Sequence, residues 1–281
     1  MILVVGFHRS GTSLMAQTLR AMGFQFGPAM LELPADGLNP RGYGELLPVV
    51  QSHEELLRSY SASWKNPEVA PSGPSVTQAL RRIIRPIEPA PAFVKDPRLC
   101  LFLSAWIPLA SKIVYVFRDP RRAALSLENA QGVDYYAGLD LWKAYLDRSE
   151  ILSKWALPTA FFEFERFCGD PSEIQRLAAF VGKPGWDIAG LEASRPTLIR
   201  TLPPFGSKSV PSAILSAWKA LETLEAAQRW KFRLEERPIV DESDSRMDPP
   251  SPEKGSNLAG VDGLSVDAAK DLPSSPDGSA A

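Results

Sequence analysis

The sequence has few cysteines and only a small excess of one charge. Its 281 residues include two cysteines, and 31 basic residues stand against 33 acidic ones. Two cysteines, Cys100 and Cys168, exclude a disulfide framework and a cysteine-based zinc site, and we expect both to be buried free thiols. Apart from residues 241–281, the chain has 28 basic and 24 acidic side chains. That surplus suits a small anionic ligand and is too weak to predict nucleic-acid binding.

No apolar run is long enough to predict a membrane span. The longest run, Leu99 to Ala110, is interrupted by Ser104 and Pro108, whereas about 20 apolar residues are needed to cross a bilayer. The amino terminus has no basic region ahead of its short apolar run, so we expect no signal peptide. With so few cysteines, the sequence predicts a reduced, cytoplasmic protein.

Short apolar segments alternate with helical patterns along the chain. This alternation predicts an α/β fold in three layers, with a mainly parallel central sheet flanked by helices. The loop at 24–44 is rich in glycine and proline, and loops of this length often carry function. Strands are predicted at 1–5, 92–95, 112–117 and 159–164, and helices at 13–22, 45–60, 76–87, 99–109, 121–128, 134–155, 171–181 and 211–237.

The predicted elements divide the chain into one domain and a tail. The domain spans 1–240, and the tail spans 241–281. The tail has no aromatic residue, is rich in Ser, Pro, Gly and Asp, and carries nine acidic against three basic side chains. Such a composition cannot bury enough apolar surface to fold, so we predict a disordered acidic tail.

A glycine-bounded turn follows the first strand directly. Gly6 and Gly11 bound the turn, Arg9 lies between them, and a helical pattern runs from Leu14. In such a turn the backbone N–H groups and the positive helix end converge on an anion. The spacing is that of the G-x-x-x-x-G-K-[ST] P-loop, but Thr12 replaces the lysine that a triphosphate needs. The pattern predicts a phosphate cradle; the alternative is an ordinary strand–turn–helix with incidental glycines.

A second arginine-bearing turn follows the strand predicted at 112–117. Arg118 stands at the end of that strand, and Ser126 comes eight residues later in a predicted helix. A guanidinium group offers a planar fork of donors to a phosphate, and a hydroxyl two turns along the helix can add another. In the alternative interpretation, Arg118 pairs with Asp119 or with a carboxylate at the sheet end, and Ser126 packs against the sheet.

Together these motifs resemble the cofactor-binding segments of sulfotransferases, which use 3′-phosphoadenosine-5′-phosphosulfate (PAPS) as donor. The run Arg9-Ser10-Gly11-Thr12-Ser13 is similar to the loop that binds the 5′-phosphosulfate, and Arg118 with Ser126 is similar to the 3′-phosphate segment. The resemblance implies a P-loop-type fold, PAPS as cofactor, bound by all of these residues, and no metal. Both turns are then expected to grip one nucleotide from neighbouring strands.

The resemblance extends beyond the two turns. The segments 39–45, 95–98 and 162–171 are similar to parts of bacterial members of the family, and the similarity covers about 1–182. It implies an acceptor with a hydroxyl group, either a carbohydrate or another small molecule. Two other functions stay open on the residues: a P-loop kinase for a small molecule, and a non-catalytic nucleotide-binding relative that acts as an interaction module.

The resemblance also suggests catalytic roles. Arg9 is expected to stabilise the charge that develops on the leaving 5′-phosphate. A general base is needed for the acceptor hydroxyl, and Glu45 and Asp96 are the candidates. Each has an alternative role: Glu45 could stabilise a helix amino end, and Asp96 could cap the following helix. Of the two histidines, His8 is expected to shape the turn, and His53 is expected to have a surface or a packing role.

Overall fold

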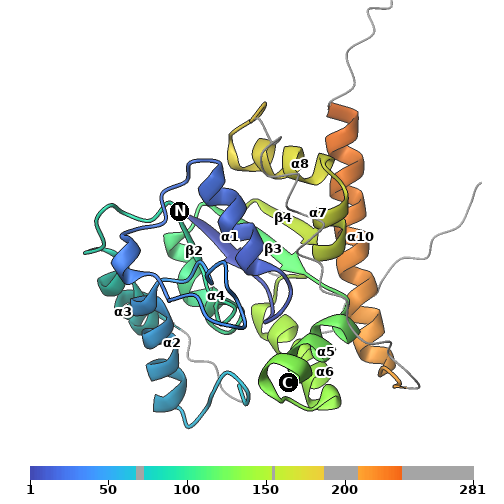
Figure 1. Cartoon of the computed structure of the whole chain (residues 1–281), viewed down its shortest axis with the longest axis horizontal. Coiled ribbons are helices and arrows are strands. Elements are labelled where there is room, and N and C mark those ends of the chain that lie inside the picture. The colour runs from blue at the N-terminus through green and yellow to red at the C-terminus, as the bar shows by residue number, and fades with distance from the viewer. Residues whose placement is uncertain (68–72, 154–155, 187–207, 236–281) are drawn as a thin grey trace, which may run out of the picture. The chain divides into compact units, whose positions relative to one another are not determined.

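Four parallel strands form the centre of the computed structural model (Figure 1). Their order is β2 (Phe93–Lys95), β1 (Ile2–Val5), β3 (Lys112–Phe117) and β4 (Thr159–Glu163), and each pairs in parallel with its neighbour. The mainly parallel sheet predicted from the sequence is therefore confirmed. It is buried because helices cover it: all four residues of β1 and five of the six in β3 are buried.

The structure describes residues 1–67, 73–153, 156–186 and 208–235. All of them belong to one unit, Met1–Arg237, whereas the unit Pro238–Ala281 lies outside the described residues. The domain boundary at residue 240 and the disordered tail therefore stay predictions. The helices are α1 (Thr12–Ala21), η1 (Ala29–Leu31), α2 (Leu47–Ser59), α3 (Pro74–Ile84), α4 (Leu99–Trp106), η2 (Ile107–Leu109), α5 (Pro120–Gln131), α6 (Tyr135–Ser149), α7 (Phe164–Gly169), α8 (Ser172–Val181) and α10 (Ser212–Glu235).

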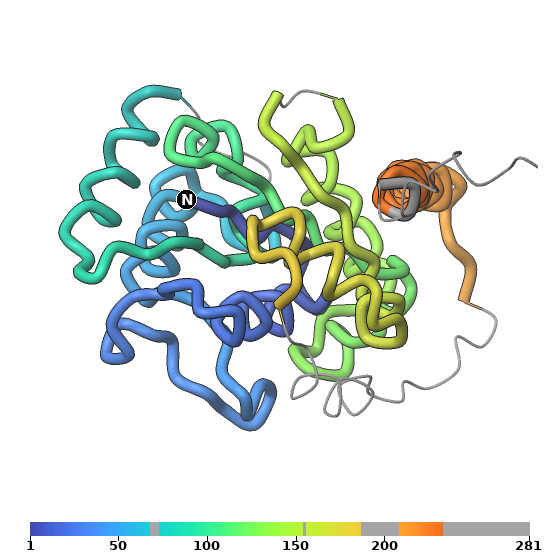
Figure 2. Tube along the Cα trace, turned by 90° about the horizontal axis from the view of Figure 1, so that it is seen from above, coloured from blue at the N-terminus to red at the C-terminus, as the bar shows by residue number. Residues whose placement is uncertain are grey.

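The helices lie on both faces of the sheet. Figure 2 shows α1 on one side and α4 with α6 on the other. This arrangement follows from the strand order: the chain moves from β1 to β2 in one direction and from β2 to β3 in the other, and right-handed crossovers then place the helices on opposite faces. Because the three strands are parallel, the loops that follow β1, β2 and β3 all lie at the same edge of the sheet.

Side chains of helix α10 cover the outer edge of β4. Gln228 accepts a hydrogen bond from the backbone N–H of Phe161 at 2.9 Å and donates one to the carbonyl of Thr159 at 2.7 Å. Glu225 accepts from the N–H of Glu163 at 2.8 Å. These contacts satisfy edge groups that would otherwise be open to pairing with another chain.

Several elements differ in their bounds from the sequence predictions. Phe164, expected to end a strand, begins helix α7, because the side chain of Glu163 accepts hydrogen bonds from the N–H groups of Glu165 and Arg166. An N-terminal cap of this kind stops the strand. The helix expected to reach residue 155 ends at Ser149.

Two expectations about the whole chain can be compared with the described residues. Cys100 and Cys168 are buried and unbridged, as predicted, and burial raises the pKa of the Cys100 thiol to about 12. Within the described ranges, no helix combines the length and the apolar composition that crossing a bilayer requires.

Candidate functional site

A cleft of about 300 Å³ opens where β1, β2 and β3 end. Its walls come from the turn after β1, the loop at 38–45, the segment after β2 and helix α5. Seven of the nine residues singled out from the sequence line this cleft: Arg9, Gly11, Thr12, Ser13, Glu45, Arg118 and Ser126. The other two, Ser10 and Asp96, are buried outside its lining.

The turn after β1 has the backbone geometry of an anion cradle. Arg9 and Gly11 both adopt left-handed conformations, with φ of 64° and 92°, and Thr12 begins α1. Alternating left- and right-handed residues turn successive N–H groups toward one point. At Gly6, an added Cβ would lie 2.2 Å from the carbonyl oxygen of Val116, so only glycine fits there. Ser10, within the turn, is fully buried.

Replacing Gly11 by alanine is expected to destabilise the protein far more than replacing Gly23. Both glycines have positive φ, 92° and 83°, which costs an L-residue about 1–2 kcal/mol. A Cβ on Gly11 would also lie 2.1 Å from the Phe164 ring, whereas nothing stands within 4 Å of one on Gly23. Overpacking adds about 1–3 kcal/mol. Urea denaturation measures the free energies of unfolding, and equal losses in the two variants would contradict the close packing at Gly11.

The two arginine-bearing turns touch each other. Because β1 pairs with β3, the turns that follow these strands are neighbours. Arg9 donates from Nε to Ser126 Oγ at 3.0 Å, and Arg118 donates from Nη1 to the carbonyl oxygen of Arg9 at 3.4 Å. The expected juxtaposition at the ends of neighbouring strands is present, and it places two guanidinium groups in one cleft.

Arg118 also makes the ion pair foreseen in its alternative interpretation. Its Nε donates to Glu165 Oε1 at 2.6 Å, so the partner is a carboxylate at the sheet end. Asp119 instead caps α5, accepting from the N–H of Arg121 at 2.8 Å. The pair does not remove Arg118 from the cleft, which it still lines.

Lys95 is a further cation of the cleft, and the sequence analysis did not name it as a site residue. Its Nζ donates to Ser13 Oγ at 3.2 Å, to the carbonyl of Tyr43 at 3.1 Å and to Glu45 Oε1 at 2.5 Å. The side chain is 1% exposed. One signal could have revealed it: like Arg9 and Arg118, Lys95 is a cation at or just past the end of an apolar strand.

Glu45 faces the cleft from the segment that enters α2. The helix begins at Leu47, two residues later than predicted, and has no side-chain cap. The Glu45 carboxylate contacts Lys95 instead, with Arg98 Nη1 at 4.0 Å. Burial raises the pKa of Glu45, although the charge of Lys95 opposes the rise. A carboxyl group with a raised pKa next to a cleft is suited to proton transfer.

Asp96 lies behind the cleft in a closed network. Its Oδ2 is 2.9 Å from His53 Nδ1, and its Oδ1 accepts from the N–H and the Nη1 of Arg98, both at 2.9 Å. Its side chain is fully buried. Burial alone would raise the pKa of Asp96, but Arg98 and His53 hold it well below its ordinary range. The structure therefore does not bring Asp96 together with the other predicted residues.

The histidines have defined partners. His8 Nε2 lies 3.2 Å from the hydroxyl of Tyr145, which donates to the carbonyl of Trp64 at 3.0 Å. Burial and then the charge of Arg98 lower the pKa of His8 to about 3, so the imidazole is neutral. His53 stacks on Phe102, with ring centroids 4.7 Å apart. His8 thus shapes the wall of the cleft, and His53 is a packing residue.

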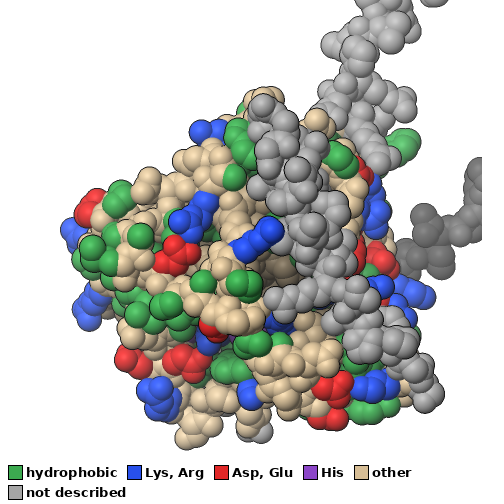
Figure 3. Space-filling model, in the orientation of Figure 1, with side chains coloured by type: hydrophobic (Ala, Val, Ile, Leu, Met, Phe, Trp, Pro, Cys, Tyr) green, Lys and Arg blue, Asp and Glu red, His purple; other side chains and the backbone are tan. Residues whose placement is uncertain are grey.

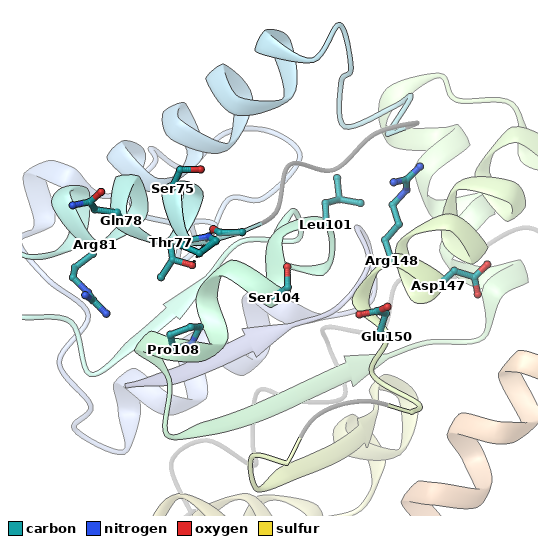
Figure 4. Close-up of a pocket in the computed structure, with 12 residues that line it drawn as sticks. Ser75, Thr77, Gln78, Arg81, Leu101, Ser104, Pro108, Asp147, Arg148 and Glu150 are labelled. Carbon is teal, nitrogen blue, oxygen red and sulfur yellow. Dashed lines mark hydrogen bonds between the residues drawn. The ribbon is translucent and has the colours of Figure 1, made fainter.

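A larger hollow of about 1030 Å³ lies between α3, α4 and the end of α6 (Figure 4). It is lined by charges of both signs, including Arg81, Arg148, Asp147 and Glu150, and shares no lining residue with the strand-end cleft. On the face shown in Figure 3, basic and acidic side chains are likewise interspersed over the described residues. The convergence of cations is thus a property of the smaller cleft.

Comparisons with known proteins give two similar solved structures. No protein-family model and no curated protein matches the chain. The sulfotransferase domain of the Synechococcus PCC 7002 olefin synthase is 15% identical over 79% of this chain and 93% of its own, with a TM-score of 0.45. Retinol dehydratase, in complex with androsterone and the inactive cofactor PAP, is 16% identical over 81% of this chain and 80% of its own, with a TM-score of 0.35. Identities and TM-scores this low assign no activity to the chain, so the function is inferred from the residues of the cleft.

Proposed function

We propose that the protein is a sulfotransferase that transfers a sulfuryl group from PAPS to an acceptor hydroxyl. One observation carries the proposal: Arg9, Ser126 and Arg118 are linked by contacts of 3.0 and 3.4 Å at the ends of adjacent parallel strands. In parallel sheets, ligands bind at this edge. Two guanidinium groups that line one cleft suit a ligand with two phosphates.

The residues of the cleft fit such a nucleotide. Gly6 and Gly11 leave no room for a side chain, because the carbonyl oxygen of Val116 and the Phe164 ring stand where the Cβ atoms would lie, so the tight turn requires glycine at both positions. Gln131, which also lines the cleft, has a buried Oε1 without a hydrogen-bond partner in the described part of the chain. A ligand donor would satisfy that oxygen. When bound, the nucleotide supplies an activated sulfuryl group.

In the proposed complex, the turn after β1 binds the 5′ end of the nucleotide, and the segment after β3 binds its 3′-phosphate. The N–H groups of Gly11 and Thr12, the hydroxyls of Thr12 and Ser13, and the guanidinium group of Arg9 bind the 5′ end, with Ser10 completing the turn. Arg118 and Ser126 bind the 3′-phosphate. Arg9 keeps its charge at every physiological pH, so it stabilises negative charge and does not donate a proton. Lys95 adds a second cation beside Ser13.

Glu45 is the proposed general base. Its carboxylate lines the cleft and accepts the proton of the acceptor hydroxyl, while Lys95 and Arg98 hold its position. Asp96, the other candidate, has both carboxylate oxygens engaged by Arg98 and His53 and stays out of contact with the cleft. We therefore propose that Asp96 holds the network of Arg98 and His53 in place, and that Glu45 is the general base.

The acceptor is proposed to be a carbohydrate or another small molecule with a hydroxyl group. The loop at 38–43 and Gln17 line a part of the wall outside the nucleotide-binding turns. Asparagine, glutamine and tyrosine side chains in this wall can hydrogen-bond to hydroxyl groups. Two buried free thiols favour the cytoplasm, and the similar segments favour a bacterial source.

Binding and transfer measurements test the proposal. Titration calorimetry should show binding of adenosine 3′,5′-bisphosphate and much weaker binding of ATP with Mg²⁺, because Thr12 stands where a triphosphate needs lysine. The reverse preference would favour a small-molecule kinase. Labelled sulfate should then move from PAPS to a pool of candidate acceptors. Tight binding of the bisphosphate without any transfer would favour a non-catalytic nucleotide-binding protein.

A further inference from the structure

The corner between β4 and α7 lies against both arginine-bearing turns. The Phe164 ring packs on the cradle so closely that a Cβ on Gly11 would be 2.1 Å away. The guanidinium carbon of Arg118 lies 4.7 Å from the centroid of the same ring. The next residue, Glu165, accepts the Nε hydrogen bond of Arg118 at 2.6 Å. One dipeptide thus contacts the parts assigned to both ends of the nucleotide.

These contacts restrict the guanidinium group of Arg118 on three sides. Glu165 engages its Nε, the carbonyl oxygen of Arg9 engages Nη1, and Phe164 lies against its face. The Arg118 side chain is only 6% exposed. An arginine has many rotamers, and fixing one before a ligand arrives removes an entropic cost from binding.

Glu165 is itself anchored by the fold. Its backbone N–H donates to the carboxylate of Glu163 at 3.2 Å, within the cap of α7. The N–H of Glu163 donates in turn to Glu225 of α10 at 2.8 Å. The backbone that carries the Glu165 carboxylate is therefore tied to the edge strand and to α10, and rigid support of this kind keeps a binding group in place.

We propose that Glu165 is a positioning residue, which holds Arg118 through Nε so that its remaining N–H groups meet the 3′-phosphate of the nucleotide. The inference rests on the proposed function and deepens it. The negative charge of a carboxylate beside Arg118 weakens the attraction between Arg118 and a phosphate. The same carboxylate favours phosphate binding by holding the guanidinium group in the required orientation. The two effects have opposite signs, so substitutions of Glu165 separate them.

The experiment compares two ligands and four proteins. Calorimetry gives the dissociation constants of adenosine 5′-phosphate and adenosine 3′,5′-bisphosphate. The first constant divided by the second is the ratio that isolates the contribution of the 3′-phosphate to binding. Glu165→Gln keeps an oxygen acceptor and loses the charge, whereas Glu165→Asp keeps the charge and shortens the side chain. Glu128→Ala is the matched control, because Glu128 lies on α5, pairs with Lys208 at 3.0 Å and does not line the cleft.

Positioning predicts that Glu165→Asp lowers the ratio by about tenfold, equivalent to about 1.4 kcal/mol. Glu165→Gln and Glu128→Ala should keep the wild-type ratio or exceed it. A wild-type ratio in Glu165→Asp, or an equal fall in Glu165→Gln, would overturn the inference and leave the proposed function intact. A wild-type protein that does not distinguish the two ligands would overturn both. Thermal denaturation verifies that each variant is folded, and the two Glu165 substitutions differ too little from glutamate to unfold α7.

Discussion

Replacing Arg9 by alanine should lower the turnover number for sulfuryl transfer by about 10²–10³-fold, the loss typical of removing one stabiliser of developing charge. Arg9 lies in the cradle turn and lines the cleft, and in the proposed complex its guanidinium group binds the leaving 5′-phosphate. Negative charge grows on that phosphate as the sulfuryl group departs, and a fixed cation in a partly buried cleft stabilises it most. Single-turnover measurements with labelled PAPS determine the rate directly.

Arg9→Lys and Arg41→Ala are the matched controls for that result. Lysine keeps the charge and should retain much of the rate, and it meets the same left-handed backbone, with φ of 64°, as alanine does. Arg41 lines the cleft from the opposite loop, so its loss should affect acceptor binding more than turnover. If Arg9→Ala retained the wild-type rate within threefold, the role of Arg9 would have to be abandoned.

Replacing Glu45 by glutamine should lower turnover by about 10²–10⁴-fold, as expected when a general base is lost. Glutamine keeps an oxygen that can accept the hydrogen bond of Lys95, so the local structure should persist. Nucleotide affinity should change little, because the proposed base does not contact the nucleotide. The measurement is the turnover number at saturating PAPS, alongside the dissociation constant of adenosine 3′,5′-bisphosphate.

The pH profile gives an independent test of Glu45. The base acts as a carboxylate, so kcat/KM should rise with pH through the pKa of Glu45. Because burial raises that pKa, the rise should lie above about 4.3, the ordinary value for glutamate. Glu45→Gln should lose this limb of the profile. Glu54→Gln should keep it, because Glu54 also pairs with Arg98 but does not line the cleft. An unchanged limb in Glu45→Gln would assign the proton transfer to another group.

Local patterns were sufficient for much of the fold. The strand at Lys112–Phe117 has the predicted bounds, and the helix after the glycine-bounded turn begins at Thr12, one residue before the predicted start, because neighbouring residues determine both elements. A run of buried apolar residues favours a strand, and a left-handed glycine before a helix favours the cradle. The short helix α7 escaped prediction because its cap, Glu163, sits within an aromatic strand pattern.

The sequence alone determined which residues could bind phosphate, since Arg9 and Arg118 follow apolar strands in glycine- or proline-bearing turns. Only the tertiary structure decided how these groups are held. Lys95 meets Glu45 across 50 positions, and Arg118 meets Glu165 across 47. Pairs so distant in sequence come together only when the parallel strands align, because burial and the strand order, rather than any local pattern, set their separation. The same packing buries Asp96 outside the lining of the cleft and places Glu45 in that lining.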